Sequence, residues 1–432
     1  MIGKPIQYQP ISQAEADEIC RKHDFLLSGK MGGARANFSY KVLKGLDLSG
    51  RNLADADFSG AIMEGAKLSG TNLTRAVLFA VDLRRADLAG AVLHRADLRG
   101  AVLRGADLTG ADLSQADLRE GAIAQVDREK GLAVITHEQR PGEASEATFA
   151  RANLSRTKMS GAIAQSSDFT DAVLIGARLT RANLRASRFP GANLEGADLS
   201  GADLTDADLR DSVLVGAKMD LARMNGTDMT GALRDAPLAE IADPGGETAR
   251  ALDLHARWCE TGGKDGAPST FDGKDLRGLE SLARRNLTAL QARGAIFYGL
   301  DMAGAELQGA KLTDADLRMV SLRGADLRGA DLKGARLNNA DLREAKLGAL
   351  ILPGDRLLAA SIAAASLRYA DLSGADLRQL DAKGADLSFA RLHGADVRRA
   401  GFSGACFTGA RLPVDLTEAA ADLSGAVDLN AA

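Results

Sequence analysis

Residues 86–110 read Ala-Asp-Leu-Ala-Gly, Ala-Val-Leu-His-Arg, Ala-Asp-Leu-Arg-Gly, Ala-Val-Leu-Arg-Gly, Ala-Asp-Leu-Thr-Gly. We take each Leu as the centre of a five-residue unit, with Ala two residues before it and Gly or a polar residue two after it. Such centres recur about 61 times in three runs, with two isolated centres besides. The runs and isolated centres are 38–118, 149–229, 282–412, Phe271 and Leu276. A period of five fits neither an amphipathic helix nor a long alternating strand, so the repeat decides the fold.

Each unit predicts a short extended segment followed by a corner. Ala and the centre lie two residues apart and therefore point to one side of the segment. The other three positions face solvent and turn the corner, where Gly relieves steric restriction. Phe149, Phe169 and Phe189 follow one another at intervals of four units, as do Phe38 and Phe58. If four units close one coil, these rings stack in a ladder inside it.

The units resemble the A(D/N)LxX motif of the pentapeptide-repeat family over roughly three quarters of the chain. This resemblance implies an all-β fold, a right-handed quadrilateral β-helix. We expect two such modules with short α-helical caps. At the usual strand spacing, about 16 coils would stack to about 75 Å.

Two helix-like segments are expected to cap the coils, because an open coil would expose a sheet edge. The first, 12–28, carries a capping box at Ser12 and Glu15. The second, 247–260, places His255 before Phe271 much as His23 precedes Phe38, which indicates an internal duplication. The expected division is a cap helix at 1–37, a first β-helix at 38–234 with a hairpin insertion at 122–146, a linker and second cap helix at 235–270, a second β-helix at 271–415, and a tail or cap at 416–432.

Two irregularities remain within the modules. A single distorted coil is the alternative to the hairpin at 122–146. Pro353 and Asp355 break the motif within 350–365.

Composition points to an ordinary reducing compartment. The formal net charge is −4, and the three Cys residues form neither a metal-binding spacing nor a disulfide framework. No apolar run reaches the length of a signal peptide or a membrane span. We expect a soluble cytoplasmic protein that does not enter a membrane.

The sequence contains no recognisable catalytic chemistry. Five His residues are scattered, and the Asp residues mostly occupy the outward position before each centre. Phosphate-binding loops, dinucleotide fingerprints, metal clusters and nucleophile elbows are all missing from the sequence. We therefore expect no catalytic residue, no cofactor, no metal and no enzyme activity. His23 and His255 are expected to be structural, with a ligand site beside them as the alternative.

Charge counts bear on DNA mimicry, which the resemblance raises because some family members protect DNA gyrase in that way. The three runs carry about 10 acids and 11 bases, about 10 of each, and about 14 acids against 19 bases. One acidic cluster stands out and is interpreted as either a solvated ring or a short mimic. Its members are Asp198, Asp203, Asp206, Asp208 and Asp211. The mildly basic third run has no interleaved aromatics, so we do not expect nucleic-acid binding.

Three aliphatic residues that we expect to be exposed precede their centres at intervals of four or eight units, namely Val42, Ile62 and Val102. They form either a docking stripe or a set of residues that simply suit strands. The leading hypothesis is a non-catalytic scaffold or regulatory protein-interaction module with a protein partner still to be identified. The alternative is a DNA-mimic binder of gyrase or another topoisomerase that confers quinolone-type protection. The sequence does not indicate an oligomeric state.

Overall fold

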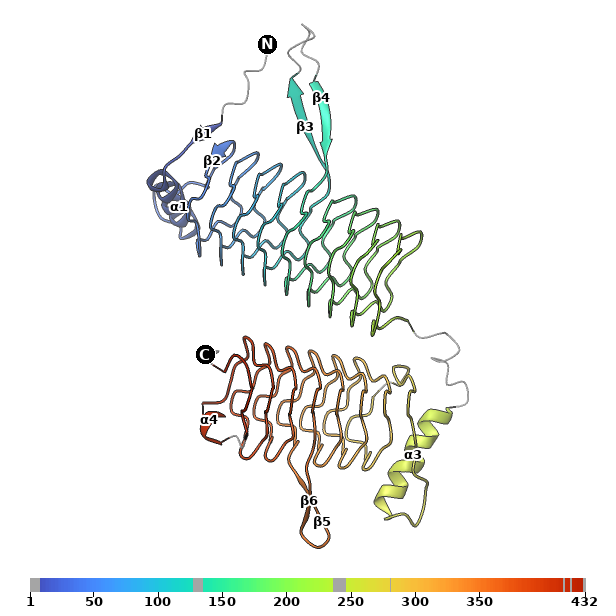
Figure 1. Ribbon diagram of the computed structural model, residues 1–432. Helices are drawn as coiled ribbons and strands as arrows, with labels where there is room; N and C mark the ends of the chain where they lie inside the picture. The colour runs from blue at the N-terminus through green and yellow to red at the C-terminus, as the bar shows by residue number, and fades with distance from the viewer. Residues whose placement is uncertain are drawn as a thin grey trace. The chain divides into compact units, whose positions relative to one another are not determined.

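The computed structural model describes residues 8–126, 135–235, 246–279, 281–414, 416–419 and 422–429. Two compact units, Met1–Asp235 and Ala236–Ala432, each consist mainly of stacked coils (Figure 1). Each unit is a right-handed quadrilateral β-helix, so the expected fold class is confirmed.

The coils are held by parallel backbone pairing between neighbouring turns. Leu88 N–H donates to the Asp107 carbonyl at 2.7 Å, and Asp107 N–H donates to the Ala86 carbonyl at 3.0 Å. In the regular parts of both units, each bridged residue lies four repeat units from its partner along the chain. Four units therefore close one coil, as the phenylalanine spacing predicts.

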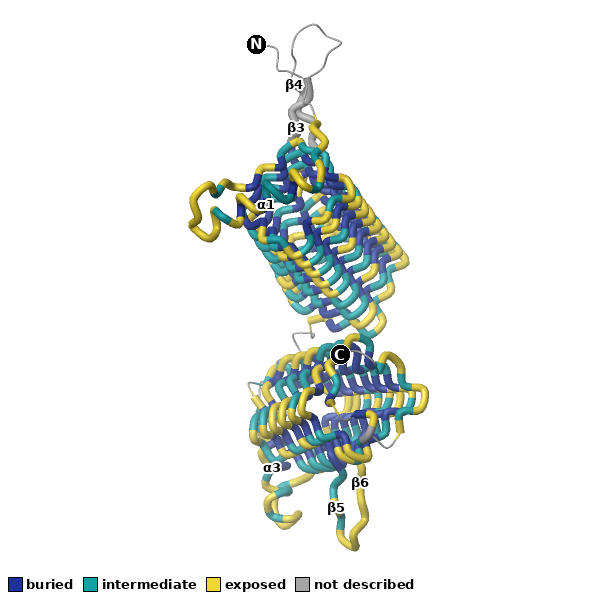
Figure 2. Tube along the Cα trace, turned by 90° about the vertical axis from the view of Figure 1, so that its left-hand side faces the viewer, coloured by how far each residue is buried: buried dark blue, intermediate teal, exposed yellow. Residues whose placement is uncertain are grey.

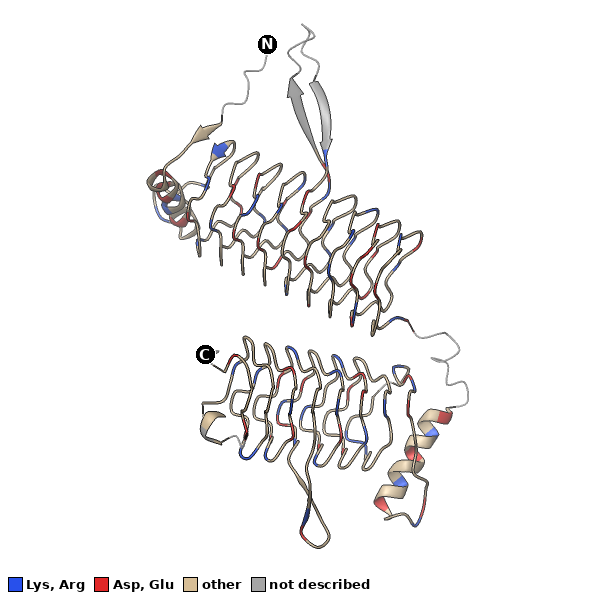
Figure 3. Ribbon diagram, in the orientation of Figure 1, with Lys and Arg blue, Asp and Glu red and all other residues tan. Residues whose placement is uncertain are grey.

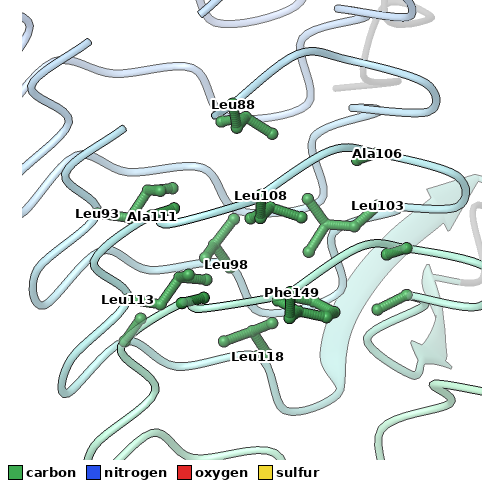
Figure 4. Close-up of a cluster of buried hydrophobic side chains, with 14 of the residues drawn as sticks. Leu88, Leu93, Leu98, Leu103, Ala106, Leu108, Ala111, Leu113, Leu118 and Phe149 are labelled. Carbon is green, nitrogen blue, oxygen red and sulfur yellow. The ribbon is translucent and has the colours of Figure 1, made fainter. Parts of the chain in front are cut away.

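The interior of each coil is filled by the Ala and Leu positions of the repeat. Figure 4 shows Leu88, Leu93, Leu98 and Leu103 pointing into the first unit's core from successive sides, and all are buried. Buried and exposed positions alternate along every coil (Figure 2). Alternation follows because successive side chains of an extended segment point to opposite faces.

The phenylalanine ladder forms as predicted. The ring centroids of Phe149 and Phe169 lie 4.9 Å apart, and those of Phe169 and Phe189 lie 4.6 Å apart. Phe38 and Phe58 stack at 4.8 Å. These spacings match the distance between neighbouring strands, so each coil contributes one ring to the stack.

The corner falls on the last residue of each five-residue repeat, and the backbone of that residue is left-handed. Gly90 has φ 64° and Arg85 has φ 55°. Glycine adopts this conformation freely, whereas a residue with a Cβ atom pays about 1 kcal/mol for it. The left-handed backbone of the corner therefore explains why Gly is frequent at this position.

The first unit begins with β1 (Gln9–Pro10) and α1 (Gln13–Leu27). The Ser12 and Glu15 side chains form a capping box at the start of α1. β1 pairs in parallel with β2 (Lys41–Val42), and the Gln13 side-chain amide exchanges two hydrogen bonds with the backbone of Asp47. The edge of the first coil is thereby covered by backbone on one side and by a side-chain amide on the next.

The second unit begins with α3 (Glu247–Glu260), which follows Gly246 without a side-chain cap and buries Leu252 and His255. Its far end carries α4 (Leu416–Ala419), whose Ala419 carbonyl accepts from Arg399 N–H at 2.8 Å. Bridges from Gly401 and Cys406 to residues 422 and 427 add further short segments to that end.

A two-stranded hairpin leaves each stack of coils (Figure 1). In the first unit, β3 (Gly121–Val126) pairs antiparallel with β4 (Ile135–Arg140), and bridging resumes at Glu143.

In the second unit, β5 (Leu350–Leu352) pairs with β6 (Arg356–Leu358). The irregularity at 350–365 is therefore an inserted hairpin. Leu352 and Leu357, which the five-residue count takes as coil centres, belong to its strands.

Candidate interaction surfaces

The cap histidines are packed against the first coil and hydrogen-bonded on both ring nitrogens. His23 Nε2 lies 2.9 Å from the Ala54 carbonyl oxygen, and its Nδ1 accepts from Ala36 N–H at 3.2 Å. His255 repeats the arrangement with the Thr288 carbonyl at 3.1 Å and Ser269 N–H at 3.0 Å. Because Nδ1 accepts, each ring is neutral with its proton on Nε2. Both imidazoles are buried and hold the coil edge, so neither is available to a ligand.

The described ranges offer no cluster of three or more His, Cys, Asp or Glu side chains that could hold a metal ion. Burial raises the pKa of the Cys20 thiol to about 11, so it is a poor nucleophile. Burial also raises the pKa of the Cys259 thiol, which donates to the Thr288 carbonyl at 3.4 Å. None of the helices in the described part of the chain is long and apolar enough to cross a membrane.

Asp and Arg two residues apart form side-chain pairs along the outside of the coils. In the sequence Asp-Leu-Arg, the Arg guanidinium binds the carboxylate through Nε and Nη2, as Arg99 does with Asp97 at 2.8 and 2.7 Å. The Arg343 guanidinium likewise lowers the pKa of Asp341. Figure 3 shows acidic and basic residues interspersed over both units. Such exposed pairs add at most about 1 kcal/mol each, and their main effect is to neutralise the surface locally.

The acidic cluster predicted from the sequence is distributed around one coil. Asp198, Asp203 and Asp208 belong to three different columns of bridges and therefore to three sides of that coil. Asp203 lies 3.6 Å from Arg185, and Asp208 binds Arg210 at 2.7 Å.

Neighbouring donors lower the pKa of all three carboxyls, with Ser200, Thr205 and Arg210 as the respective leading causes. Asp206 and Asp211 occupy the corners between these sides, and both are exposed. The cluster is therefore a ring, and its role in partner binding stays a prediction.

The aliphatic stripe forms one column, because Val42, Ile62, Asp82 and Val102 are successive bridge partners. Val42 and Ile62 are half-buried, and β1 lies beside Val42. Val102 is only 6% exposed, so the expectation that all three are exposed is wrong. It lies in a shallow depression that Arg84, Arg104, Arg140 and Pro141 also line, where the chain returns from β4. Partner binding by this column stays a prediction.

A pocket beside the β5–β6 hairpin is a surface that the sequence did not indicate. Its volume is about 440 Å³. Four guanidinium groups, one carboxylate and two hairpin aliphatics meet there. The lining residues are Arg328, Gly348, Ala349, Ile351, Leu357, Asp376, Arg378, Gln379, Arg398 and Arg399. Leu357 keeps the five-residue spacing of the centres, and Ile351 has the outward place before the centre Leu352, so neither stood out from the regular repeat.

A family model described as pentapeptide repeats matches the chain in eight copies. The matched ranges are 42–78, 82–119, 167–206, 192–231, 286–318, 310–348, 360–400 and 384–412. No sequence among curated proteins matches the chain.

Three pentapeptide-repeat or related solved structures are among those that match the chain. QnrB1, a plasmid-mediated fluoroquinolone resistance protein, is 20% identical over 48% of this chain and 89% of its own, with a TM-score of 0.23. HetL from the cyanobacterium Nostoc sp. strain PCC 7120, involved in heterocyst differentiation regulation, is 23% identical over 94% and 97%, with a TM-score of 0.19. Rfr23 from the cyanobacterium Cyanothece 51142 is 24% identical over 32% and 91%, with a TM-score of 0.19. TM-scores this low support no inference about function.

Proposed function

Because the chain belongs to the pentapeptide-repeat family, we propose that it is a non-catalytic scaffold or regulatory module that acts by binding a protein. Members of this family are generally non-catalytic scaffolds. A cytoplasmic location is part of the proposal, as is the division into the caps, modules, linker and tail expected from the sequence.

The observation that carries the proposal is the construction of the coils. Their interiors are filled by buried Ala, Leu and Phe side chains, so the repeat offers its outer sides for recognition. Parallel pairing fixes the backbone of each side, and corner residues fix where each side ends. A surface held in place in this way loses little conformational entropy when a partner binds, which favours a binding role.

Affinity capture from the native host tests the proposal. The tagged full chain is incubated with host extract, and the retained proteins are quantified against a tagged chain that has been thermally unfolded. We expect one or a few proteins to be enriched by the folded chain and released by salt. Equal recovery with the unfolded chain would reject the proposal.

A second candidate, DNA mimicry directed at gyrase or another topoisomerase, is favoured by one column of the first unit. This column holds six carboxylates against two basic residues. In order, it comprises Asp47, Lys67, Asp87, Asp107, Thr148, Asp168, Arg188, Asp208 and Asp228. At about 4.8 Å per coil the column is much sparser than a DNA duplex, which carries one charge per ~1.7 Å. For this reason it ranks second.

A gyrase supercoiling assay, with and without a fluoroquinolone, distinguishes the two candidates. Mimicry predicts that the chain inhibits supercoiling or relieves drug inhibition, and that Asp87→Asn with Asp107→Asn weakens the effect. The scaffold proposal predicts no change in supercoiling at any concentration of the chain.

A further inference from the structure

The β5–β6 hairpin is fixed to the coil through one of its two faces. Leu350 pairs with Leu358 across the hairpin, and both lie against the corner at Gly329. A Cβ atom at Gly329 would come within 2.9 Å of Leu350 and 3.0 Å of Leu358. The hairpin base is therefore seated on this glycine, and the Gly329 N–H bond to the Gly348 carbonyl at 3.2 Å secures the exit point.

The opposite face of the hairpin presents two aliphatic side chains to solvent. Ile351 and Leu357 are directly paired across the strands, so their side chains lie next to each other. They are 70% and 57% exposed and form one wall of the pocket. Covering such exposed aliphatic side chains with another apolar group removes apolar surface from water, which is favourable.

The pocket is also lined by arginines that share one side of the coils and so form one column. Arg328, Arg378 and Arg398 each bind the Asp two residues earlier through Nε and Nη2. A guanidinium has five N–H donors in a planar fork, so the Nη1 edge of each remains for another acceptor. Arg399 lies at the adjoining corner and also lines the pocket. Among the described residues it has no ion-pair partner, so its guanidinium can donate to a ligand from either edge.

Gly348 opens this column. It occupies the position after Leu347 that carries Arg on the neighbouring coils, so the column has a gap between Arg328 and Arg378. A Cβ atom there would lie 3.3 Å from the Arg378 carbonyl oxygen and 3.5 Å from an Asp376 carboxylate oxygen. Acceptor oxygens therefore line the gap, and an anionic ligand group is better matched by the guanidinium of Arg399 than by the gap itself.

We propose that this pocket is a docking site for an extended, acidic segment of a partner protein, in which a carboxylate side chain alternates with aliphatic or aromatic ones. The carboxylate would bind the Arg399 guanidinium, and its apolar neighbour would cover Ile351 and Leu357. Three of the four guanidinium groups are each paired with an Asp, so Arg399 leaves the site with one net positive charge, which complements a single carboxylate of the partner. This inference rests on the proposed protein-binding function and locates it.

A nucleic acid fits this pocket less well. The lining residues include no aromatic ring on which a base could stack, and one net positive charge suits a single carboxylate better than a polyanionic backbone. A hydrophobic wall beside the guanidinium edges is better matched by a peptide than by a phosphate backbone.

Fluorescence anisotropy with the full chain tests the inference. The probe is a short labelled peptide in which Leu and Phe alternate with Glu, flanked by Gly and Ser for solubility. We expect saturable binding, at least about tenfold weaker when the Glu residues are replaced by Gln or the apolar residues by Ser. Leu357→Asp and Arg399→Glu should each weaken binding about tenfold, because both side chains line the pocket. Neither side chain supports the coil, so both variants should fold.

Matched controls separate the pocket from general charge and exposure effects. Arg284→Glu changes another left-handed corner arginine of the same unit, and Val414→Asp changes an aliphatic residue that is fully exposed and lies outside the pocket lining. Both should bind the peptide as the native chain does. No binding by the native chain, equal losses in the controls, or tighter binding of a single-stranded oligonucleotide than of the peptide would each overturn the inference.

The outcome for the proposed function is read separately in the affinity capture. If a partner is retained equally by the native chain and by Leu357→Asp, protein binding stands and the pocket is not its site. If the native chain retains no partner, the proposed function itself fails.

Discussion

His23 donates from Nε2 to the carbonyl oxygen of Ala54 across 2.9 Å, and so takes the place that a backbone N–H has in the next coil. There, the equivalent carbonyl of Thr74 accepts from Asp55 N–H at 2.9 Å. The imidazole also receives Ala36 N–H on Nδ1, so one side chain satisfies a carbonyl and an amide at the open edge of the stack. His255 does the same for Thr288 and Ser269 in the second unit.

Replacing His23 by Ala should loosen the first coil. Two buried hydrogen bonds are lost and a cavity is left, which together cost roughly 3–5 kcal/mol of local stability. Hydrogen exchange at the Ala36 amide should accelerate accordingly. His94→Ala, which removes a half-buried imidazole bonded to Ser114 Oγ on the outside of a coil, should leave that amide protected. Equal exchange in both variants would contradict the capping role.

The second cap should weaken in mild acid because of His255. Burial lowers the pKa of its imidazole in the folded chain, whereas the unfolded chain has the ordinary value of about 6.5. The unfolded state therefore binds the proton more readily, so the stability is fully present above about pH 6.5 and is lost as the pH falls below it. Protonation at Nδ1 would also oppose the Ser269 N–H.

Trp258, the single Trp of the chain, reports this change directly, because its ring lies 5.8 Å from the His255 ring. Urea unfolding followed by its fluorescence should show a midpoint that falls between about pH 6.5 and 5. His255→Gln keeps a donor and an acceptor but does not titrate, so its midpoint should be lower at neutral pH and flatter across this range. A native midpoint that does not change with pH would contradict the expectation.

The phenylalanine ladder should be sensitive to volume more than to aromaticity. Phe169 lies between Phe149 and Phe189, so Phe169→Ala leaves a cavity between two rings and should cost about 3–5 kcal/mol. Phe169→Leu restores the residue found at most centres and should cost roughly 1–2 kcal/mol. Hydrogen exchange at the Phe149 and Phe189 amides measures both losses. Similar losses in the two variants would indicate that the stack itself, and not filled volume, holds these coils.

Gly329→Ala should release the β5–β6 hairpin. Gly329 (φ 68°) and Gly324 (φ 64°) are both left-handed corners, so an added Cβ atom costs about 1 kcal/mol at either. At Gly329 that atom would also clash with Leu350 and Leu358, whereas nothing lies within 4 Å at Gly324. Trypsin cleavage after the exposed Arg356 should therefore be faster in Gly329→Ala than in Gly324→Ala. Identical rates would show that the hairpin base is not held there.

The coil could be predicted from the sequence because every five-residue repeat shows the same pattern of residue types. Ala and Leu two residues apart fix the inner face, and the Phe149, Phe169 and Phe189 spacing fixes four sides. Local sequence alone could not show burial by neighbours. Val102 has the same place in its unit as Ile62, yet the chain returning from β4 lies beside it and covers it.

The two inserted hairpins differ in how strongly they disturb the repeat in the sequence. Val102 and Glu143 are bridge partners whose separation along the chain is not a multiple of five, so the first insertion shifts the phase of the repeat and interrupts the pattern. Asp331 and Ser361 are bridge partners six units apart instead of four, so the second insertion adds two whole units and preserves the phase. Leu352 and Leu357 consequently looked like core positions. Because Leu357 lines the pocket, the pocket was not predicted either.

The central claim is that this chain acts by binding a protein, and calorimetric titration of the captured partner into the full chain tests it most directly. We predict a saturable complex of fixed stoichiometry, weakened about tenfold by Leu357→Asp and unaffected by Val414→Asp. A purified partner that gives no saturable heat with the native chain, at concentrations well above those of the extract, would contradict the claim.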